Sequence, residues 1–201
     1  MTPFGPPIPG ETPIDDVSGL KVTGITTRAE LNYFEAANIE RVAAKYLTIR
    51  PTRRSAKFTY EWCLNLHQQM FGDVWSWAGI PRSGELNIGV VSHAIPENLA
   101  LLLEDLGSWP GFGIEFAEQA ARLHHRAVKI HPFQNGNGRW ARMLANIWLK
   151  LNRQPLTMWP ETAIGTASEV RVQYIDAIVK ADVGEYRDLI QMHRKFVEQP
   201  Q

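Results

Sequence analysis

The sequence predicts a mainly α-helical domain that carries one small β-hairpin. Apolar residues recur at three- and four-residue intervals through most of the 201 residues, the pattern of helices with one buried face. Proline, glycine and capping residues divide these stretches into about seven helices. A strand pattern, in which apolar and polar residues alternate, occurs only weakly, at Leu86, Ile88 and Val90. Helices therefore supply the core, and two short strands supply the hairpin.

The bulk composition is that of an ordinary globular domain. Hydrophobic residues make up 44% of the chain, charged residues 21%, and the formal net charge is zero. We therefore expect no direct nucleic-acid binding and no attraction to anionic membranes. The lone cysteine, Cys63, excludes an intramolecular disulfide and favours a reducing, cytoplasmic location. The sequence also shows no secretory signal and no apolar run of membrane-spanning length.

Residues 1–24 are rich in proline and glycine and predict an irregular N-terminal arm, followed by a helical domain at residues 25–201. The arm is either a mobile tail or a strap over the domain or a partner. The first helix is expected at residues 27–47, because Thr27 and Glu30 have the spacing of a capping box. Glu35 and Asn38 interrupt its apolar face, and they are either edge residues or functional groups.

The middle of the chain predicts two further helices and the hairpin. Ser55 is a candidate cap for a helix that ends at Gly72, and Pro96 opens a leucine-rich helix that ends at Gly107. The hairpin lies between these two helices, at residues 82–95.

An amphipathic helix at residues 115–130 leads into the most informative stretch, residues 131–142. Pro132 disfavours helical backbone at His131, so this helix should end near residue 130. Glycines at 136 and 138 open the next helix, whose free amides and dipole favour phosphate. Arg139 and Arg142 are one turn apart and suit phosphate oxygens. His131 is then placed as a general base for a hydroxyl that attacks phosphorus.

The remaining segments carry apolar faces without evident chemistry. Two helices beyond residue 160 are expected to close the core, and a loop precedes them. His124 and His125 favour buried core histidines over metal ligands, since no ligand motif accompanies them.

Residues 131–142 resemble the signature of Fic-domain proteins, H-x-F-x-[DE]-G-N-G-R-x-x-R, over a core of about residues 55–151. The resemblance implies transfer of AMP from ATP to a serine, threonine or tyrosine hydroxyl of a target protein, with His131 as the base. It places the glycine amides, with Asn137, on the inner phosphates, and the two arginines on the outer phosphates. The implied nucleotide-binding residues are Phe133, Gly136, Asn137, Gly138, Arg139 and Arg142.

One position departs from this signature. Asn135 stands where the family usually has the aspartate or glutamate that binds magnesium. An amide oxygen is a weaker ligand for hard cations such as Mg²⁺ or Mn²⁺. A catalytically weakened nucleotide- or partner-binding module is therefore the alternative function, and AMP removal or transfer from another nucleotide-like donor is a third.

The resemblance also implies regulation and partners. Many Fic proteins carry an inhibitory helix whose glutamate pairs with the second motif arginine; here Glu35, or Glu30, is the candidate and Arg142 its partner. The hairpin corresponds to the flap that docks an extended target segment, through Leu86, Asn87, Ile88 and Gly89. The whole chain resembles the bacterial mobile mystery protein B subgroup, usually found beside a small helix-turn-helix protein, which implies such a partner.

Overall fold

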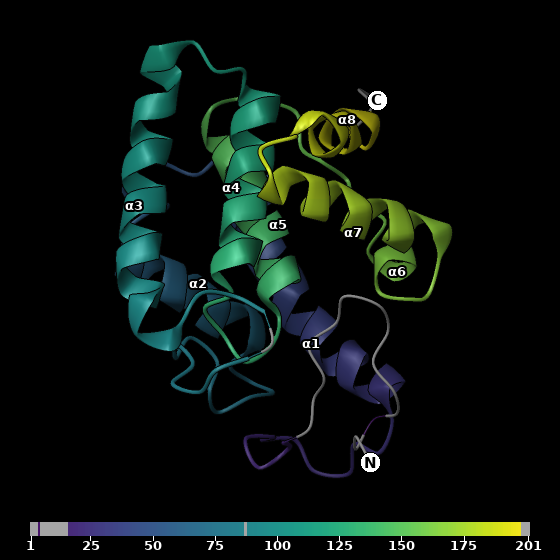
Figure 1. Ribbon diagram of the computed structural model, residues 1–201. Coiled ribbons are helices and arrows are strands. Elements are labelled where there is room, and N and C mark those ends of the chain that lie inside the picture. Colours follow the sequence, from purple (N-terminus) through teal and green to yellow (C-terminus); the bar gives the residue numbers. More distant parts are fainter. Residues whose placement is uncertain (1–3, 5–15, 87, 198–201) are drawn as a thin grey trace.

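The computed structural model describes residue 4, residues 16–86 and residues 88–197. These residues form an assembly of helices joined by loops (Figure 1). In chain order the α-helices are α1 (Arg28–Ala43), α2 (Tyr60–Phe71), α3 (Ile95–Ser108), α4 (Phe116–Ile130), α5 (Asn137–Leu151), α6 (Glu161–Ile164), α7 (Glu169–Asp182) and α8 (Arg187–Lys195). Shorter turns extend this set: a π-helical turn (Ala44–Thr48) and two 3₁₀ turns (Ser92–Ala94 and Trp109–Phe112).

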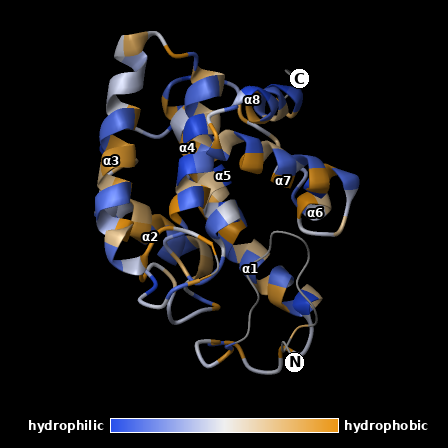
Figure 2. Ribbon diagram, in the orientation of Figure 1, coloured by the Kyte–Doolittle hydropathy of each residue, from blue (hydrophilic) through white to orange (hydrophobic). Residues whose placement is uncertain are grey.

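α4 and α5 pack on each other at the centre of the molecule (Figure 1). α3 lies along one side of α4, α7 and α8 lie along the other, and α1 packs against α2. The main hydrophobic cluster contains buried residues from each of the helices α1 through α5, and a second cluster connects α4 with the last three helices. Apolar and polar segments alternate along the helices in Figure 2, as expected where one face of each is buried. The loop between the two central helices therefore has a rigid base.

The start of α1 confirms the predicted capping box. The Thr27 hydroxyl accepts a hydrogen bond from the Glu30 amide at 3.2 Å, and the Glu30 carboxylate accepts from the amides of Thr26 and Thr27 at 2.9 and 3.0 Å. These bonds lower the pKa of Glu30, the Thr26 amide contributing most. Glu30 is therefore a helix cap.

Two predicted helix boundaries differ from the structure. α2 begins at Tyr60 with Thr59 as its cap, because Ser55 instead closes a turn with Thr52. Gly107 does not end its helix; α3 runs on to Ser108 and through a 3₁₀ turn to Gly113, whose φ of 69° is the left-handed value that stops a helix. The loop expected after residue 151 contains the short helix α6.

The expected hairpin is not found in the described part of residues 82–95. Over residues 16–86 and 88–197 the β pairing consists of two isolated bridges, Leu20 with Trp75 and Thr157 with Val197. The physical reason lies at Arg82, whose side chain donates to the carbonyls of Gly84 and Val90. One guanidinium thus binds backbone groups that a second strand would otherwise pair.

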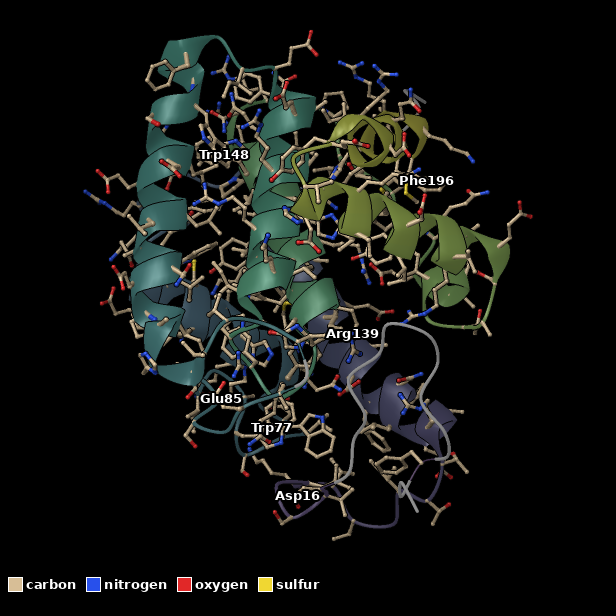
Figure 3. All side chains as sticks on the ribbon, viewed as in Figure 1. Asp16, Trp77, Glu85, Arg139, Trp148 and Phe196 are labelled. Atoms are coloured by element: carbon tan, nitrogen blue, oxygen red, sulfur yellow. The ribbon has the colours of Figure 1, made fainter. Side chains whose placement is uncertain are left out.

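The last part of the predicted arm lies on the domain. The amide of Lys21 donates to Val74 at 2.8 Å, and the amide of Ser76 donates to Gly19 at 2.8 Å. Gly19 packs so closely that a Cβ there would lie 2.5 Å from the Trp77 ring, and Asp16 and Trp77 lie at the same end of the molecule (Figure 3). Residues 17–21 are therefore a strap. Among the described helices, none has the length and apolar character needed to cross a membrane.

Candidate functional site

Residues 131–136 link α4 to α5 in a tight loop. His131 ends α4 with a left-handed φ of 53°, and Gly136 precedes α5 with a φ of 78°. A Cβ at Gly136 would lie 2.7 Å from the Phe71 ring, so glycine meets both the backbone angle and the close approach. The first amides of a helix have no acceptor within it, so this end of α5 offers N–H donors and positive dipole charge to an anion.

Two motif side chains shape this loop from inside. The Asn137 side chain accepts from the Phe133 amide at 3.0 Å and donates to the Phe133 carbonyl at 2.8 Å. Phe133 is fully buried. Its ring stacks on the His67 ring, 3.6 Å between ring centroids, and lies edge-on to the Trp140 ring, 5.1 Å between ring centroids. The side chains of Phe133 and Asn137 are therefore committed to the interior of the loop, and the role of Phe133 in nucleotide binding stays a prediction.

His67 supports the loop from α2, a role that a lone histidine on an apolar helix face does not reveal in sequence. Its Nδ1 accepts from the Gly79 amide at 3.0 Å, so its Nε2–H donates to the Asn135 carbonyl at 3.1 Å. Burial lowers the pKa of His67 to about 3, with the Asn135 bond opposing this and Arg139 adding to it. His67 is neutral at physiological pH and holds a fixed tautomer.

His131 lies at the mouth of the loop and is 6% exposed. Burial lowers its pKa to about 4, a bond to the Val128 backbone opposes this, and the positive charge of Arg82 lowers it further. The imidazole is therefore unprotonated at neutral pH and is able to accept a proton.

Arg139, labelled in Figure 3, forms an ion pair with Glu35 of α1. The distance from its Nη1 to Oε2 of Glu35 is 2.6 Å, and its guanidinium lies over the Phe71 ring. The other oxygen of Glu35 accepts from the Trp75 indole at 2.7 Å. From the sequence, the expected partner of Glu35 is Arg142. The correct partner is Arg139, because the direction of α1 across α5 cannot be inferred from either helix alone.

Arg142 is buried and pairs with Glu161 of α6. Its Nε donates to Oε1 at 2.8 Å, and its Nη1 reaches the Tyr174 hydroxyl at 3.4 Å. Burial works against the charge, but Glu161 and Tyr174 raise the pKa of Arg142 above its usual value. Glu161 is not predicted from the sequence, because the residues around it have the pattern of a loop.

A buried polar chain continues from Tyr174 to the last helix. The Tyr174 hydroxyl is hydrogen-bonded to His124 at 2.9 Å, His124 to His193 at 3.3 Å, and His193 to Thr157 at 2.9 Å. His125 is bonded separately to Tyr186 and Asp182. Both histidines of α4 are thus core residues, as expected, and residues 16–86 and 88–197 bring together no group of three acidic, histidine or cysteine side chains fit for a metal.

Asn135 does not supply a free metal ligand. Its Oδ1 accepts from the Gly136 amide at 2.7 Å, and its main-chain carbonyl accepts from His67. The buried carboxylate on this side, Glu35, is committed to Arg139 and Trp75. This donor set does not fit a dedicated cation site.

The loop before α3 packs directly against His131. A Cβ at Gly89, whose φ is 98°, would lie 2.7 Å from the His131 Cβ. Ile88 is 41% exposed, and Leu86 is half-buried. The predicted docking residue Asn87 lies outside the described residues. The loop is thus beside the candidate base, although it is no hairpin.

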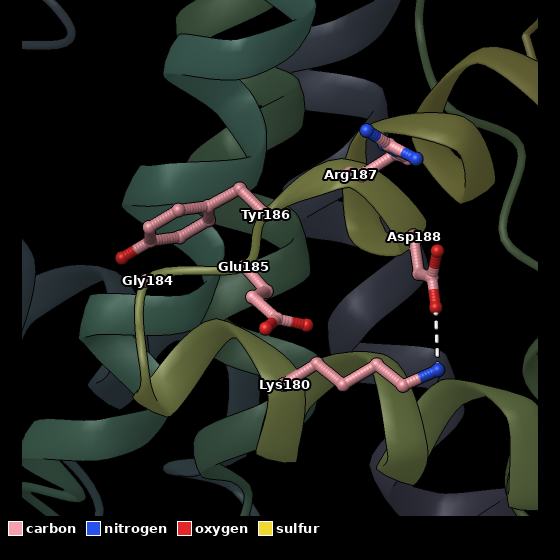
Figure 4. Close-up of a pocket in the computed structure, with 6 residues that line it drawn as sticks. All are labelled: Lys180, Gly184, Glu185, Tyr186, Arg187 and Asp188. Carbon is pink, nitrogen blue, oxygen red and sulfur yellow. Dashed lines mark hydrogen bonds and ion pairs between the residues drawn. The ribbon is translucent and has the colours of Figure 1, made fainter.

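A hollow of about 610 Å³ lies on the C-terminal helices, apart from this loop (Figure 4). Six residues line it: Lys180, Gly184, Glu185, Tyr186, Arg187 and Asp188. The Lys180 Nζ lies 2.8 Å from the Asp188 carboxylate and also pairs with Asp176, so the charge of this lysine is already neutralised by neighbouring carboxylates. None of these residues belongs to the loop of residues 131–142.

Comparisons with known proteins agree with this geometry. Residues 57–149 match the Fic/DOC family model. The chain is 28% identical over 140 residues to "Protein adenylyltransferase fic-1" of Caenorhabditis elegans, covering 67% of this chain and 26% of the relative. It is 26% identical over 153 residues to "Protein adenylyltransferase Fic" of Aedes aegypti, covering 74% of this chain and 29% of that relative. The chain thus spans less than a third of these relatives.

Solved structures share the fold. Residues 134–508 of C. elegans Fic-1 superpose with a TM-score of 0.68 and 21% identity, covering 87% of this chain and 50% of that one. BepC from Bartonella tribocorum, solved with bound AMPPNP, superposes with a TM-score of 0.65 and 17% identity. The match covers 89% of this chain and 91% of BepC. Residues 57–149 thus resemble the Fic/DOC family, and the matched segment contains the whole stretch from His131 to Arg142.

Proposed function

We propose that this protein is an adenylyltransferase that transfers AMP from ATP to a hydroxyl of a target protein. The observation that carries the proposal is the neutral, buried His131 beside the amino end of α5, where Arg139 also lies. Amides and an arginine suit a polyphosphate, and a neutral imidazole next to them suits the removal of a hydroxyl proton. The names of the C. elegans and Aedes relatives support the same reaction.

In the proposed reaction the hydroxyl oxygen bonds to the α-phosphorus of ATP. The bond from that phosphorus to the bridging oxygen breaks, pyrophosphate leaves with the electron pair, and the hydroxyl proton passes to His131. The amides of Asn137 and Gly138 hold the inner phosphates, and Arg139 and Arg142 neutralise the outer ones. Mg²⁺ or Mn²⁺, the proposed metals, would arrive with the nucleotide, since the donor set offers no dedicated site.

We also propose that the protein restrains itself. Both motif arginines are paired with carboxylates, Arg139 with Glu35 and Arg142 with Glu161. A triphosphate would have to displace these carboxylates to use the same donors. The Glu35 part of this proposal is the inhibitory role expected from sequence, with a different arginine as its partner.

The target is proposed to dock along the loop of residues 84–91, beside His131, where Ile88 offers exposed apolar surface. From the sequence resemblance we further propose that the chain is a cytoplasmic bacterial protein of the mobile mystery protein B subgroup, with a small helix-turn-helix protein as partner. Co-purification of the two expressed proteins tests this partnership.

The direct test uses the purified protein and its His131→Ala form with ATP and magnesium or manganese. Intact-mass spectrometry then reports covalent AMP on the protein or on an added candidate target. AMP addition by the natural or Glu35→Gly protein, and none by His131→Ala, supports the transferase. An adduct that persists in His131→Ala contradicts the assigned base.

A nucleotide-binding module is the second candidate, and Asn135 is the observation that favours it. Its neutral amide bonds to Gly136 where the family signature has an acidic residue. If Asn135→Asp gains an activity that the natural protein lacks at equal ATP occupancy, the binding module is the better description.

A further inference from the structure

Arg82 is a buried arginine outside the family signature, with its side chain 2% exposed. Its Nε donates to the His131 carbonyl at 2.8 Å, and its Nη1 donates to Gly84 at 2.9 Å. Its Nη2 donates to Val90, and Glu85 lies 3.6 Å away as a half-exposed counter-ion. The three nitrogens of one guanidinium thus bind three separate backbone carbonyls.

These carbonyls belong to two structures that meet at the candidate active site. One is the His131 peptide, and the other is the loop of residues 84–86 and 88–91, which contacts His131 through Gly89. The Arg82 amide adds a bond of 2.8 Å to Pro132, and the Val90 amide adds one of 3.3 Å to Ile130. Glycine at 89 lets the loop touch the His131 side chain. The Arg82 side chain therefore links the carbonyls of Gly84 and Val90 to the His131 carbonyl.

Electrostatics act in the same direction as the geometry. From the loop, Arg82 places a buried positive charge near the imidazole, and from α4 the Val128 backbone accepts from its ring. A nearby cation disfavours a protonated histidine. Removing the charge of Arg82 would therefore bring the pKa of His131 upward from about 4.

We propose that Arg82 is a positioning residue, which holds the backbone of His131 and the loop carbonyls of Gly84 and Val90 in one fixed arrangement. The proposal rests on the proposed transferase function, because it assigns the loop to the target and His131 to its hydroxyl. Arg82 does not touch the reacting atoms. It sets the distance from the docking loop to the base, where a misplacement of about 1 Å can cost on the order of 100-fold in rate.

The test compares Arg82→Lys and Arg82→Met with the natural protein. Lysine keeps the charge but loses the planar fork, so it cannot bind all three carbonyls. Methionine keeps the length of the stem and loses the charge. The matched control is Arg171→Met. Arg171, on α7, is likewise buried and donates to a backbone carbonyl, that of Ile164, at 2.6 Å.

The first readout is the NMR titration of the His131 ring, assigned by its loss in His131→Ala, which requires no catalysis. Arg82→Met should raise the pKa of His131 above the natural value, whereas Arg82→Lys and Arg171→Met should leave it in place. Both Arg82 variants should shift the amide signals of Gly84, Gly89 and Val90. An unchanged pKa together with unchanged loop signals in Arg82→Met overturns the proposal.

The second readout is the ATP dependence of AMP addition in the Glu35→Gly background. Both Arg82 variants should lower the maximal rate by about 100-fold while the half-saturating ATP concentration stays within about twofold. Equal losses in Arg171→Met would point to a general effect on folding and contradict a specific role. If Arg82→Met fails to fold, Arg82→Lys carries the rate and loop-signal tests. If the proposed transferase function is wrong, no form of the protein will carry an AMP adduct. The pKa of His131 and the loop amide signals still test the role of Arg82 in that case.

Discussion

Glu35 and Arg139 are 104 positions apart in the chain and form an ion pair of 2.6 Å across the amino end of α5. Glu35 is 2% exposed, so this carboxylate is held in place by Arg139 and by the Trp75 indole. A buried charge is stabilised only when its partners remain. The pair therefore competes with any anion that approaches Arg139.

Glu35→Gln should tighten ATP binding by about tenfold, equivalent to about 1.4 kcal/mol, because Arg139 no longer has a charged partner. The amide oxygen still accepts from Trp75, which separates loss of charge from loss of packing. Calorimetric titration with ATP measures the affinity, and Glu40→Gln, an exposed change on the same helix, is the control. An ATP affinity equal to that of the control would exclude a competing role.

Glu161→Gln should tighten ATP binding less than Glu35→Gln does. The Glu161 side chain is 52% exposed, and solvent-exposed ion pairs contribute about 0–1 kcal/mol. It should therefore give way to a phosphate more readily than the buried Glu35. The same titration ranks the two variants, and a larger effect at Glu161 would assign the main restraint to α6.

Tyr174→Phe should cost about 1–3 kcal/mol of stability and should also weaken ATP binding, because its hydroxyl joins Arg142 to His124. Tyr186→Phe is a close control, since its hydroxyl bonds to the neighbouring histidine, His125, without an Arg142 contact. Urea unfolding should detect a loss in both variants. The hypothesis fails if ATP affinity changes equally in the two.

The buried histidines should make the fold sensitive to acid. Burial lowers the pKa of His67 and of His193 to about 3, from an ordinary 6.5. Below pH 6.5 the unfolded chain binds more protons than the fold, so stability falls as the pH falls toward 3. From pH 6.5 to 5 each should cost about 2 kcal/mol, measured by urea unfolding.

His193→Gln is the corresponding control, because glutamine retains hydrogen-bonding capacity and does not titrate. Its stability should depend less steeply on pH than that of the natural protein over the same range. An identical slope would show that His193 does not take up a proton on unfolding.

Gly136→Ala should destabilise the fold by several kcal/mol and remove ATP binding, because φ is 78° and the new methyl group would meet Phe71. Gly107→Ala is the opposite case, since this glycine is helical with open space around its Cβ position. It should stabilise the protein by about 0.5–1 kcal/mol. Thermal unfolding compares the two, and tolerance of alanine at 136 would contradict the need for glycine.

Local signals in the sequence predicted local structure well. The Thr27–Glu30 spacing predicted the start of α1, Gly72 the end of α2, and Pro132 the end of α4. These features act within a few residues, so they are legible without the fold. Pro132 and the glycines of the signature also indicated the tight connection between α4 and α5.

Relations between distant segments were not predictable in this way. The partner of Glu35 depends on how α1 crosses α5, and Glu161 meets Arg142 only because α6 returns to the loop. The weak alternation at Leu86 suggested a hairpin, but a single buried guanidinium at Arg82 supplies the loop's bonds instead. His67 looked like any residue on a buried helix face, and only its contacts with Gly79 and Asn135 reveal its role.

The two carboxylates that neutralise the loop both come from outside residues 57–149, Glu35 before them and Glu161 after them. The matched segment therefore contributes the cationic, anion-seeking half of the site, and the flanking segments contribute its counter-charges. Under the proposed function, substitutions in α1 or α6 would change the affinity for the nucleotide while the sequence of residues 131–142 stays constant. The proposed restraint and the proposed chemistry thus lie in different segments of the chain.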